Sequence, residues 1–183
     1  MLQETPELVE LRAGPAILAV SPPAGGSITR YASQHDGTTF EWMRPALPEA
    51  IRNRSAGSTS SFPLVPFSNR IRNAAFRFRG RVIQLPQNFP PEPHAIHGHG
   101  WRAPWRVAAR SAASLTLEYR HPAGAWPWSY RAEQTFMLTP DHLAVRFGVT
   151  NEASEPMPVG FGLHPYFVRT PRVRVRAAVG RMW

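Results

Sequence analysis

The chain has 183 residues, of which 43% are hydrophobic, and this fits one globular domain with a real core and is short for two. It contains no cysteine, which excludes a disulfide framework and thiol chemistry, and its longest apolar run, Pro15–Val20, is too short to cross a bilayer. The acidic N-terminus is followed by no apolar run of the signal-peptide kind, so we expect a cytoplasmic protein with no membrane partner.

The formal net charge is +9, and all 21 basic residues other than histidine are arginines. They are spread along the chain, with mild clustering at Arg70–Arg81 and Arg169–Arg181. Nucleic-acid binding needs basic residues gathered on one face, and neither cluster carries a recognisable nucleic-acid motif. The pattern favours a solvated, arginine-rich surface, and we expect no nucleic-acid partner.

Alternating apolar and polar residues predict strands rather than helices. In Ala74–Leu85, Phe76 and Phe78 face one way and the intervening arginines the other, and Gly80 is placed for the turn of a hairpin. Ser114–Arg120 alternates in the same way. Both segments are therefore predicted to be strands with one buried face.

Three further strands are predicted nearer the C-terminus. Tyr130–Leu138 and His142–Thr150 are joined by a Thr-Pro-Asp turn signal at 139–141, and Val173–Val179 alternates again. No stretch has a helical period over three turns, and 20 prolines and 13 glycines separate short apolar runs. The sequence predicts an antiparallel all-β sandwich or barrel, in a single domain over residues 1–183.

Two segments are predicted to be loops. Arg52–Ser61 is polar and rich in small residues, and Gln87–His94 is a proline-rich connector that leads into a histidine cluster. Loops held by a rigid sheet are common places for functional sites. The residues that follow the second loop are therefore candidates for a functional site.

The cluster His94–Val107 combines three histidines with glycines and tryptophans. Histidine is suited to proton transfer near neutral pH. On a strand His97 and His99 would face the same side and could bind a metal, but the next carboxylate, Glu118, is on what is predicted to be a later strand. We therefore expect no metal, and a structural role for His99.

Two other motifs carry polar groups suited to a ligand. In PFSNRIRN, Asn69 and Arg70 offer several donors to hydroxyl or phosphate oxygens, although a surface arginine is the common alternative. In FGLHPYF, His164 is a candidate partner for His97. Whether the two histidines form one acid–base site is open at this point.

PFSNRI, HAIHGHGW and TNEASEPMPVGFGLHPYF, in this order and at these spacings, resemble the aldose 1-epimerases (galactose mutarotases), and the resemblance covers essentially the whole chain. GRVIQLPQN and WPWSYRAEQTF also fit the family. The resemblance implies a large antiparallel β-sandwich of the galactose mutarotase-like type. It also implies the interconversion of the α and β anomers of a free aldose, such as galactose, without cofactor or metal.

The resemblance assigns roles to particular residues. His164 would protonate the ring oxygen, and His97 would hold the sugar and help to polarise the same region. Arg70 and Asn69 would bind sugar oxygens, and Trp101 and Tyr166 would form walls of the sugar pocket. The expected partner is a small-molecule sugar, and no oligomeric state is predicted.

One departure from the family is large. Members of the family continue beyond the equivalent of Trp183, and their general base, a glutamate, and a sugar-binding aspartate lie in that later part. No carboxylate between Glu4 and Glu155 occupies a matching motif. We therefore expect a sandwich that is incomplete at its C-terminus, and a 183-residue chain that alone is poorly soluble and nearly inactive.

Two alternative functions stay open at this point. A relative that acts on hexose 6-phosphates would use the arginines of Arg70–Arg81 to bind the phosphate. A non-catalytic carbohydrate-binding sandwich would use tryptophans as stacking platforms, and the candidates are Trp101, Trp105, Trp126 and Trp128.

Overall fold

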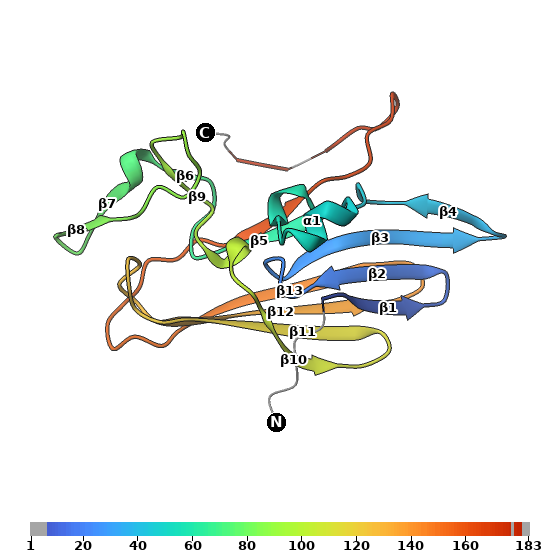
Figure 1. The fold of residues 1–183 in the computed structure, drawn as a ribbon, viewed down its shortest axis with the longest axis horizontal. Helices are drawn as coiled ribbons and strands as arrows, with labels where there is room; N and C mark the ends of the chain where they lie inside the picture. Colours follow the sequence, from blue (N-terminus) through green and yellow to red (C-terminus); the bar gives the residue numbers. More distant parts are fainter. Residues whose placement is uncertain (1–6, 177, 181–183) are drawn as a thin grey trace.

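The computed structural model describes residues 7–176 and 178–180, and its main elements are two antiparallel β-sheets (Figure 1). The larger sheet has the order β1-β2-β3-β5-β14, with β4 paired to β3. Its strands are β1 (Val9–Ala13), β2 (Ala16–Ser21), β3 (Ser27–His35), β4 (Thr38–Glu41), β5 (Ser61–Leu64) and β14 (Gly162–Pro165). The second sheet is the meander β10 (Arg106–Arg110), β11 (Ser114–His121), β12 (Tyr130–Leu138) and β13 (Leu143–Asn151).

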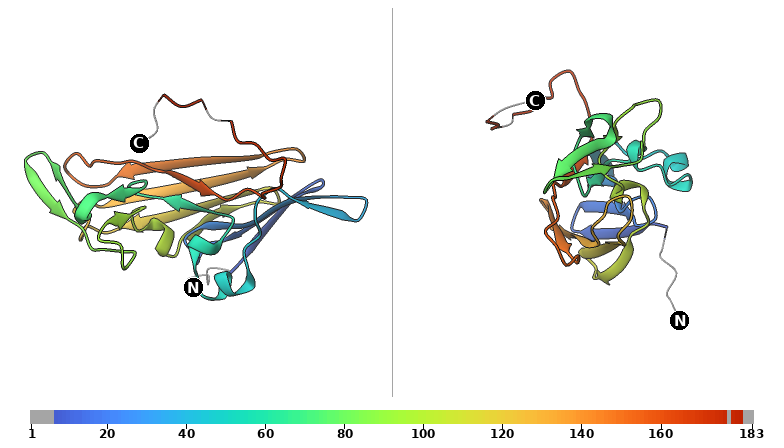
Figure 2. Two further views of the ribbon diagram at one scale, coloured as in Figure 1. Left: turned by 90° about the horizontal axis from the view of Figure 1, so that it is seen from above. Right: turned by 90° about the vertical axis from the view of Figure 1, so that its left-hand side faces the viewer.

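Smaller elements connect the two sheets. The pairs are β6 (Arg70–Ile71) with β9 (Ala95–Ile96), and β7 (Ala75–Phe78) with β8 (Arg81–Gln84). The helical turns are α1 (Pro48–Arg52), η1 (Ala56–Ser58), η2 (Arg72–Ala74) and η3 (Gly100–Arg102). Figures 1 and 2 show the hairpin β7–β8 at one end of the molecule and the hairpin β3–β4 at the other.

The two sheets pack against each other through one hydrophobic core. Strand alternation places Leu11 and Leu18 of the larger sheet and Leu117 and Phe136 of the meander in this core, and all four are at most 1% exposed. One buried hydrogen bond also joins the sheets, because the Gln134 amide donates to the carbonyl of Gly26, between β2 and β3, at 3.1 Å. This arrangement confirms the predicted antiparallel all-β sandwich.

Most of the predicted strands are confirmed. The hairpin within Ala74–Leu85 turns at Arg79 and Gly80, whose positive φ values of 50° and 78° are those of the two central residues of a hairpin turn. The strands predicted at Ser114–Arg120, Tyr130–Leu138 and His142–Thr150 correspond to β11, β12 and β13.

The strand predicted at Val173–Val179 is wrong over the part of that segment that the structure describes. Residues 173–176 have no strand pairing, and Val173 and Val175 are 50% and 84% exposed. Alternation alone does not make a strand, because each strand needs a neighbour to accept its backbone hydrogen bonds.

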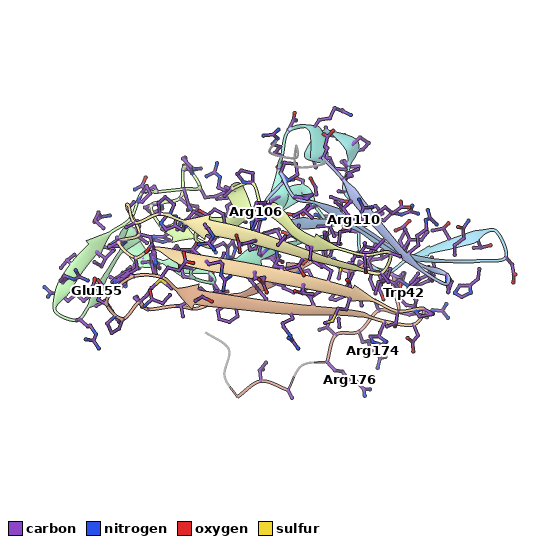
Figure 3. All side chains as sticks on the ribbon, turned by 90° about the horizontal axis from the view of Figure 1, so that it is seen from below. Trp42, Arg106, Arg110, Glu155, Arg174 and Arg176 are labelled. Carbon is purple, nitrogen blue, oxygen red and sulfur yellow. The ribbon has the colours of Figure 1, made fainter. Side chains whose placement is uncertain are left out.

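The arginines are distributed over several surfaces. Figure 3 shows Arg106 and Arg110 on β10, and Arg174 and Arg176 on the segment after β14. On the meander, Glu118 gathers three guanidinium groups, at 2.9 Å from Arg106, 3.1 Å from Arg120 and 3.6 Å from Arg131. Hydrogen bonding by Arg106 is the main cause that lowers the pKa of Glu118. The expectation of no nucleic-acid partner stays a prediction.

Among the described residues, no helix is both long and apolar enough to cross a membrane.

Candidate active site

His97 lies directly after the short strand β9 and is held in a left-handed backbone conformation. Its φ is 59°, which costs of order 1 kcal/mol for a residue other than glycine. The backbone N–H of His97 donates to the carbonyl of Asn69 at 3.0 Å, and the backbone N–H of Asn69 donates to Nδ1 of His97 at 3.1 Å. Both the backbone and the ring of His97 are therefore fixed against Asn69.

Burial sets the protonation state of His97, and the contact with Asn69 sets which ring nitrogen carries the proton. Burial lowers the pKa of His97 to about 4, and electrostatic interactions with His164 and Arg70 add to the shift. The ring is therefore neutral near pH 7, and since Nδ1 accepts a hydrogen bond, the single ring proton lies on Nε2. His97 can thus offer one N–H donor to a bound molecule.

His164 is brought to the same place by the pairing of β14 with β5. The register puts His164 opposite Phe62, and the two rings stack with centroids 4.8 Å apart. Tyr166, two residues further on, lies 4.8 Å from His164 between ring centroids. The centroids of His164 and His97 are 5.4 Å apart, so two segments that are distant in sequence bring their imidazoles together.

Both histidines line a cleft of about 700 Å³. Trp101 and Tyr166, the predicted walls, also line it. Trp101 belongs to η3, and its indole N–H donates to the carbonyl of Gly98 at 3.1 Å, which fixes the ring beside the histidine segment. A cleft of this size, walled by aromatic rings with a few polar groups, suits a small polar ring such as a monosaccharide.

The two residues predicted to bind sugar oxygens lie beside the cleft rather than among its lining residues. Arg70 is on β6, and its Nε atom is 3.4 Å from a carboxylate oxygen of Glu92, with both side chains partly exposed. Asn69 contacts His97 through its backbone, as described above. Their proposed contacts with sugar therefore stay predictions.

Sequence reasoning missed one wall of the cleft. Residues 53–58, which follow α1 and include η1, line it together with Arg102 of η3. The polar, small-residue composition of this segment predicted only a loop, and nothing in it indicated that Arg54 would lie near the histidines. None of the described residues that line the cleft is an aspartate or a glutamate.

The expectation that His97 and His99 share one face is wrong, because β9 ends at Ile96 and the chain then turns. His99 faces a second pocket, where its Nε2 atom is 2.8 Å from the hydroxyl of Tyr130 and its ring centroid is 4.0 Å from that of His121. Burial lowers the pKa of His99 to about 3. Burial also lowers the pKa of His121. His99 thus has structural contacts, as the sequence analysis expected.

The described residues contain no group of three histidine, aspartate or glutamate side chains arranged to hold a metal ion. Glu118, the carboxylate considered for such a site, is instead surrounded by arginines.

The fold and the site together define a class: an antiparallel β-sandwich with a histidine-paired, aromatic-walled cleft for a small polar molecule. Residues 7–179 match the family model of aldose 1-epimerase. The chain therefore belongs to the aldose 1-epimerase family.

Individual relatives agree with this assignment. The chain is 37% identical, over 161 residues, to the uncharacterized protein YphB of Escherichia coli K12, and the match covers 86% of this chain and 55% of YphB. The crystal structure of a putative aldose 1-epimerase from Escherichia coli K12 has a TM-score of 0.79 at 38% identity, covering 90% of this chain and 53% of that one. The chain thus spans about half the length of these relatives.

A more distant structure shows the same fold. A galactose mutarotase-like protein from Clostridium acetobutylicum has a TM-score of 0.76 at 20% identity, and the match covers 86% of this chain and 49% of that one.

Proposed function

We propose that the protein acts in the interconversion of the α and β anomers of a free aldohexose, in which the described cleft binds the sugar. The observation that carries this proposal is the pair of imidazoles, His97 and His164, 5.4 Å apart between ring centroids in an aromatic-walled cleft. Family membership supports the reaction class. The sugar identity and a cytoplasmic location stay predictions.

Anomer exchange needs one proton delivered and one removed. In the proposed mechanism His164 gives a proton to the ring oxygen while a base takes the proton of the anomeric hydroxyl, so that the C1–O5 bond breaks and an open aldehyde forms. His97 donates its Nε2–H to the sugar near the ring oxygen and polarises it. Rotation about C1–C2 and closure on the other face reverse the proton transfers and give the other anomer.

In this proposal two of the described lining residues act as the acid and the polarising donor, and none of the described lining residues is a carboxylate. A positioned proton-transfer group contributes a factor of about 10² to 10⁴ to the rate. We therefore expect slow turnover by this chain alone, and turnover that responds to an external base.

Polarimetry on freshly dissolved α-glucose and α-galactose tests the proposal, with and without acetate and against buffer blanks of the same composition. A small protein-dependent rate that acetate increases is expected, and His164→Ala should remove it. His35→Ala, which changes an exposed histidine at the far end of β3, is the matched control. A wild-type rate equal to the blanks, together with unchanged tryptophan fluorescence on adding sugar, would refute the proposal.

One observation favours a second candidate, an epimerase for hexose 6-phosphates. Arg54 and Arg102 both line the cleft, whereas Arg81, one of the arginines first considered, is 2.5 Å from Glu155 in an ion pair. If the substrate carries a phosphate, glucose 6-phosphate should bind more tightly than glucose, and Arg54→Ala should remove the difference. Equal binding of the two sugars would eliminate this candidate.

A carbohydrate-binding sandwich with four tryptophan platforms is wrong for this fold. Trp105, Trp126 and Trp128 are at most 3% exposed and belong to the core between the sheets. Of the four, only Trp101 lines the cleft.

A further inference from the structure

The side chain of Asn88 forms hydrogen bonds on both sides of His97. Its Nδ2 donates to the carbonyl of Ile96 at 2.8 Å and to that of Gly98 at 2.7 Å, and its Oδ1 accepts the backbone N–H of Ile96 at 2.8 Å. One amide group thus holds the carbonyls of the two residues on either side of His97. The Asn88 side chain thus satisfies backbone groups that a paired strand would otherwise bond to.

His97 needs such support because its backbone conformation is intrinsically unfavourable. A left-handed histidine persists only where the surroundings fix it, and His97 continues neither the extended chain of β9 nor a helix. Backbone groups supply the other anchors: His97 N–H donates to the carbonyl of Asn69, and His99 N–H donates to that of Val65 at 3.0 Å. Asn88 differs from them because it acts through a side chain, which a mutation can remove.

Asn88 is also connected to the cleft wall. Arg102, which lines the cleft, donates a hydrogen bond to the backbone carbonyl of Asn88. Asn88 therefore bonds to the backbone around His97 through its side chain and to an arginine of the cleft through its own carbonyl.

We propose that Asn88 is a positioning residue, which holds His97 left-handed so that Nδ1 stays on the Asn69 N–H and Nε2–H points to the bound sugar. The inference rests on the proposed function for the role of His97 toward sugar, but the positioning itself is measurable without any sugar.

The test is nuclear magnetic resonance of histidine-labelled protein, comparing wild type with Asn88→Ala. Two-bond correlations report which nitrogen of each imidazole carries the proton. Wild-type His97 should be in the Nε2–H form near neutral pH. Asn88→Ala should give a mixture of the two neutral forms, since the ring is no longer fixed on Asn69, while His99 should change less.

Gln84→Ala is the matched control. The Gln84 amide also donates to backbone carbonyls, those of Ala74 at 3.1 Å and Leu85 at 3.2 Å, but in the neighbouring hairpin and without contact to His97. The control should leave the His97 spectrum unchanged. A folded Asn88→Ala protein with a wild-type His97 spectrum would overturn the proposal.

Asn88→Asp provides a second variant of nearly the same shape that lacks both donor hydrogens. It should alter the His97 spectrum as the alanine variant does. If both Asn88 variants fail to fold while Gln84→Ala folds, the proposal is also overturned, because Asn88 would then support the fold in general rather than His97 in particular.

A titration of each protein with glucose separates this inference from the proposed function. Asn88→Ala should weaken the sugar-dependent shift of the His97 signals about 10-fold or more in affinity, since a misplaced contact group loses most of its binding. If wild-type signals do not respond to glucose or galactose at all, the proposed function fails, while the sugar-free comparison still decides whether Asn88 positions His97.

Discussion

His97 and His99 are separated by one glycine, yet their rings face two different pockets and both have a lowered pKa, to about 4 and about 3. In the unfolded chain both would titrate near 6.5, so between these values the unfolded state binds more protons than the folded state. The contribution of these two histidines to stability is therefore fully present above about pH 6.5 and is lost as the pH falls, down to about 4 for His97 and about 3 for His99.

Urea unfolding across this pH range measures the effect. Each of the two histidines contributes a slope of at most about 1.4 kcal/mol per pH unit, and less for His97, which is half-buried. His99→Gln should reduce the loss of stability on acidification, whereas the exposed His35→Gln should not. Parallel pH profiles for wild type and His99→Gln would contradict the assignment.

At the level of single residues, the sequence predicted which histidines would meet but not how they are held. The pairing of His97 with His164 follows from two motifs that match the family pattern. The proton position on His97 and its support by Asn88 depend on a left-handed backbone after β9, and no local pattern of residue types indicates that conformation.

At the level of elements, the turn after β9 depends on Gly98. Its φ is 68°, and a Cβ atom there would lie 2.0 Å from the carbonyl oxygen of Val65. Gly37, between β3 and β4, has a φ of 77° but no atom within 4 Å of such a Cβ. The two glycines share a backbone requirement and differ in steric space, which makes them a matched pair.

We expect Gly37→Ala to lower the free energy of unfolding by about 1 kcal/mol, the cost of a left-handed alanine. Gly98→Ala should cost at least about 3 kcal/mol, because overpacking against Val65 is added to that strain. Chemical denaturation of both variants gives the comparison. Equal losses would mean that the chain near Gly98 can move away from Val65.

Alternating apolar and polar residues predicted correctly the strand at Ser114–Arg120, which pairs with a neighbouring strand on each side. The same alternation failed over the described residues 173–176 of the segment Val173–Val179, because apolar periodicity shows which face a strand would bury but not whether another strand is there to pair with it.

At the level of the whole molecule, the sandwich is packed unevenly. Between β1–β3 and β10–β12 the core is fully enclosed, with Leu117 at 0% exposure. An apolar groove of about 420 Å³ lies by β13 and β14, and Leu143 and Leu163 line it. Leu117 on β11 and Leu143 on β13 belong to the same meander but thus have different surroundings.

Leu117→Ala should lower the free energy of unfolding by about 2 to 5 kcal/mol, as expected for a leucine deleted from an enclosed core. Leu143→Ala should cost about 1 kcal/mol or less, because its side chain is only half-buried and leaves no closed cavity. Urea titration at neutral pH compares the two variants. A larger loss for Leu143→Ala would show that the groove is closed in solution.

The path of the chain between β4 and β5 has an evolutionary consequence. Both strands pair with the same edge of β3, β4 at Ala32–His35 and β5 at Ile28. The backbone still bonds to β3 at Ala46 and does so again at Ser60, so residues 47–59 leave the sheet and return to it at nearly the same place. Part of this excursion, residues 53–58, forms a wall of the cleft. Insertions or deletions there can reshape the cleft while every strand keeps its register, which gives descendants of this gene a route to new ligand preferences.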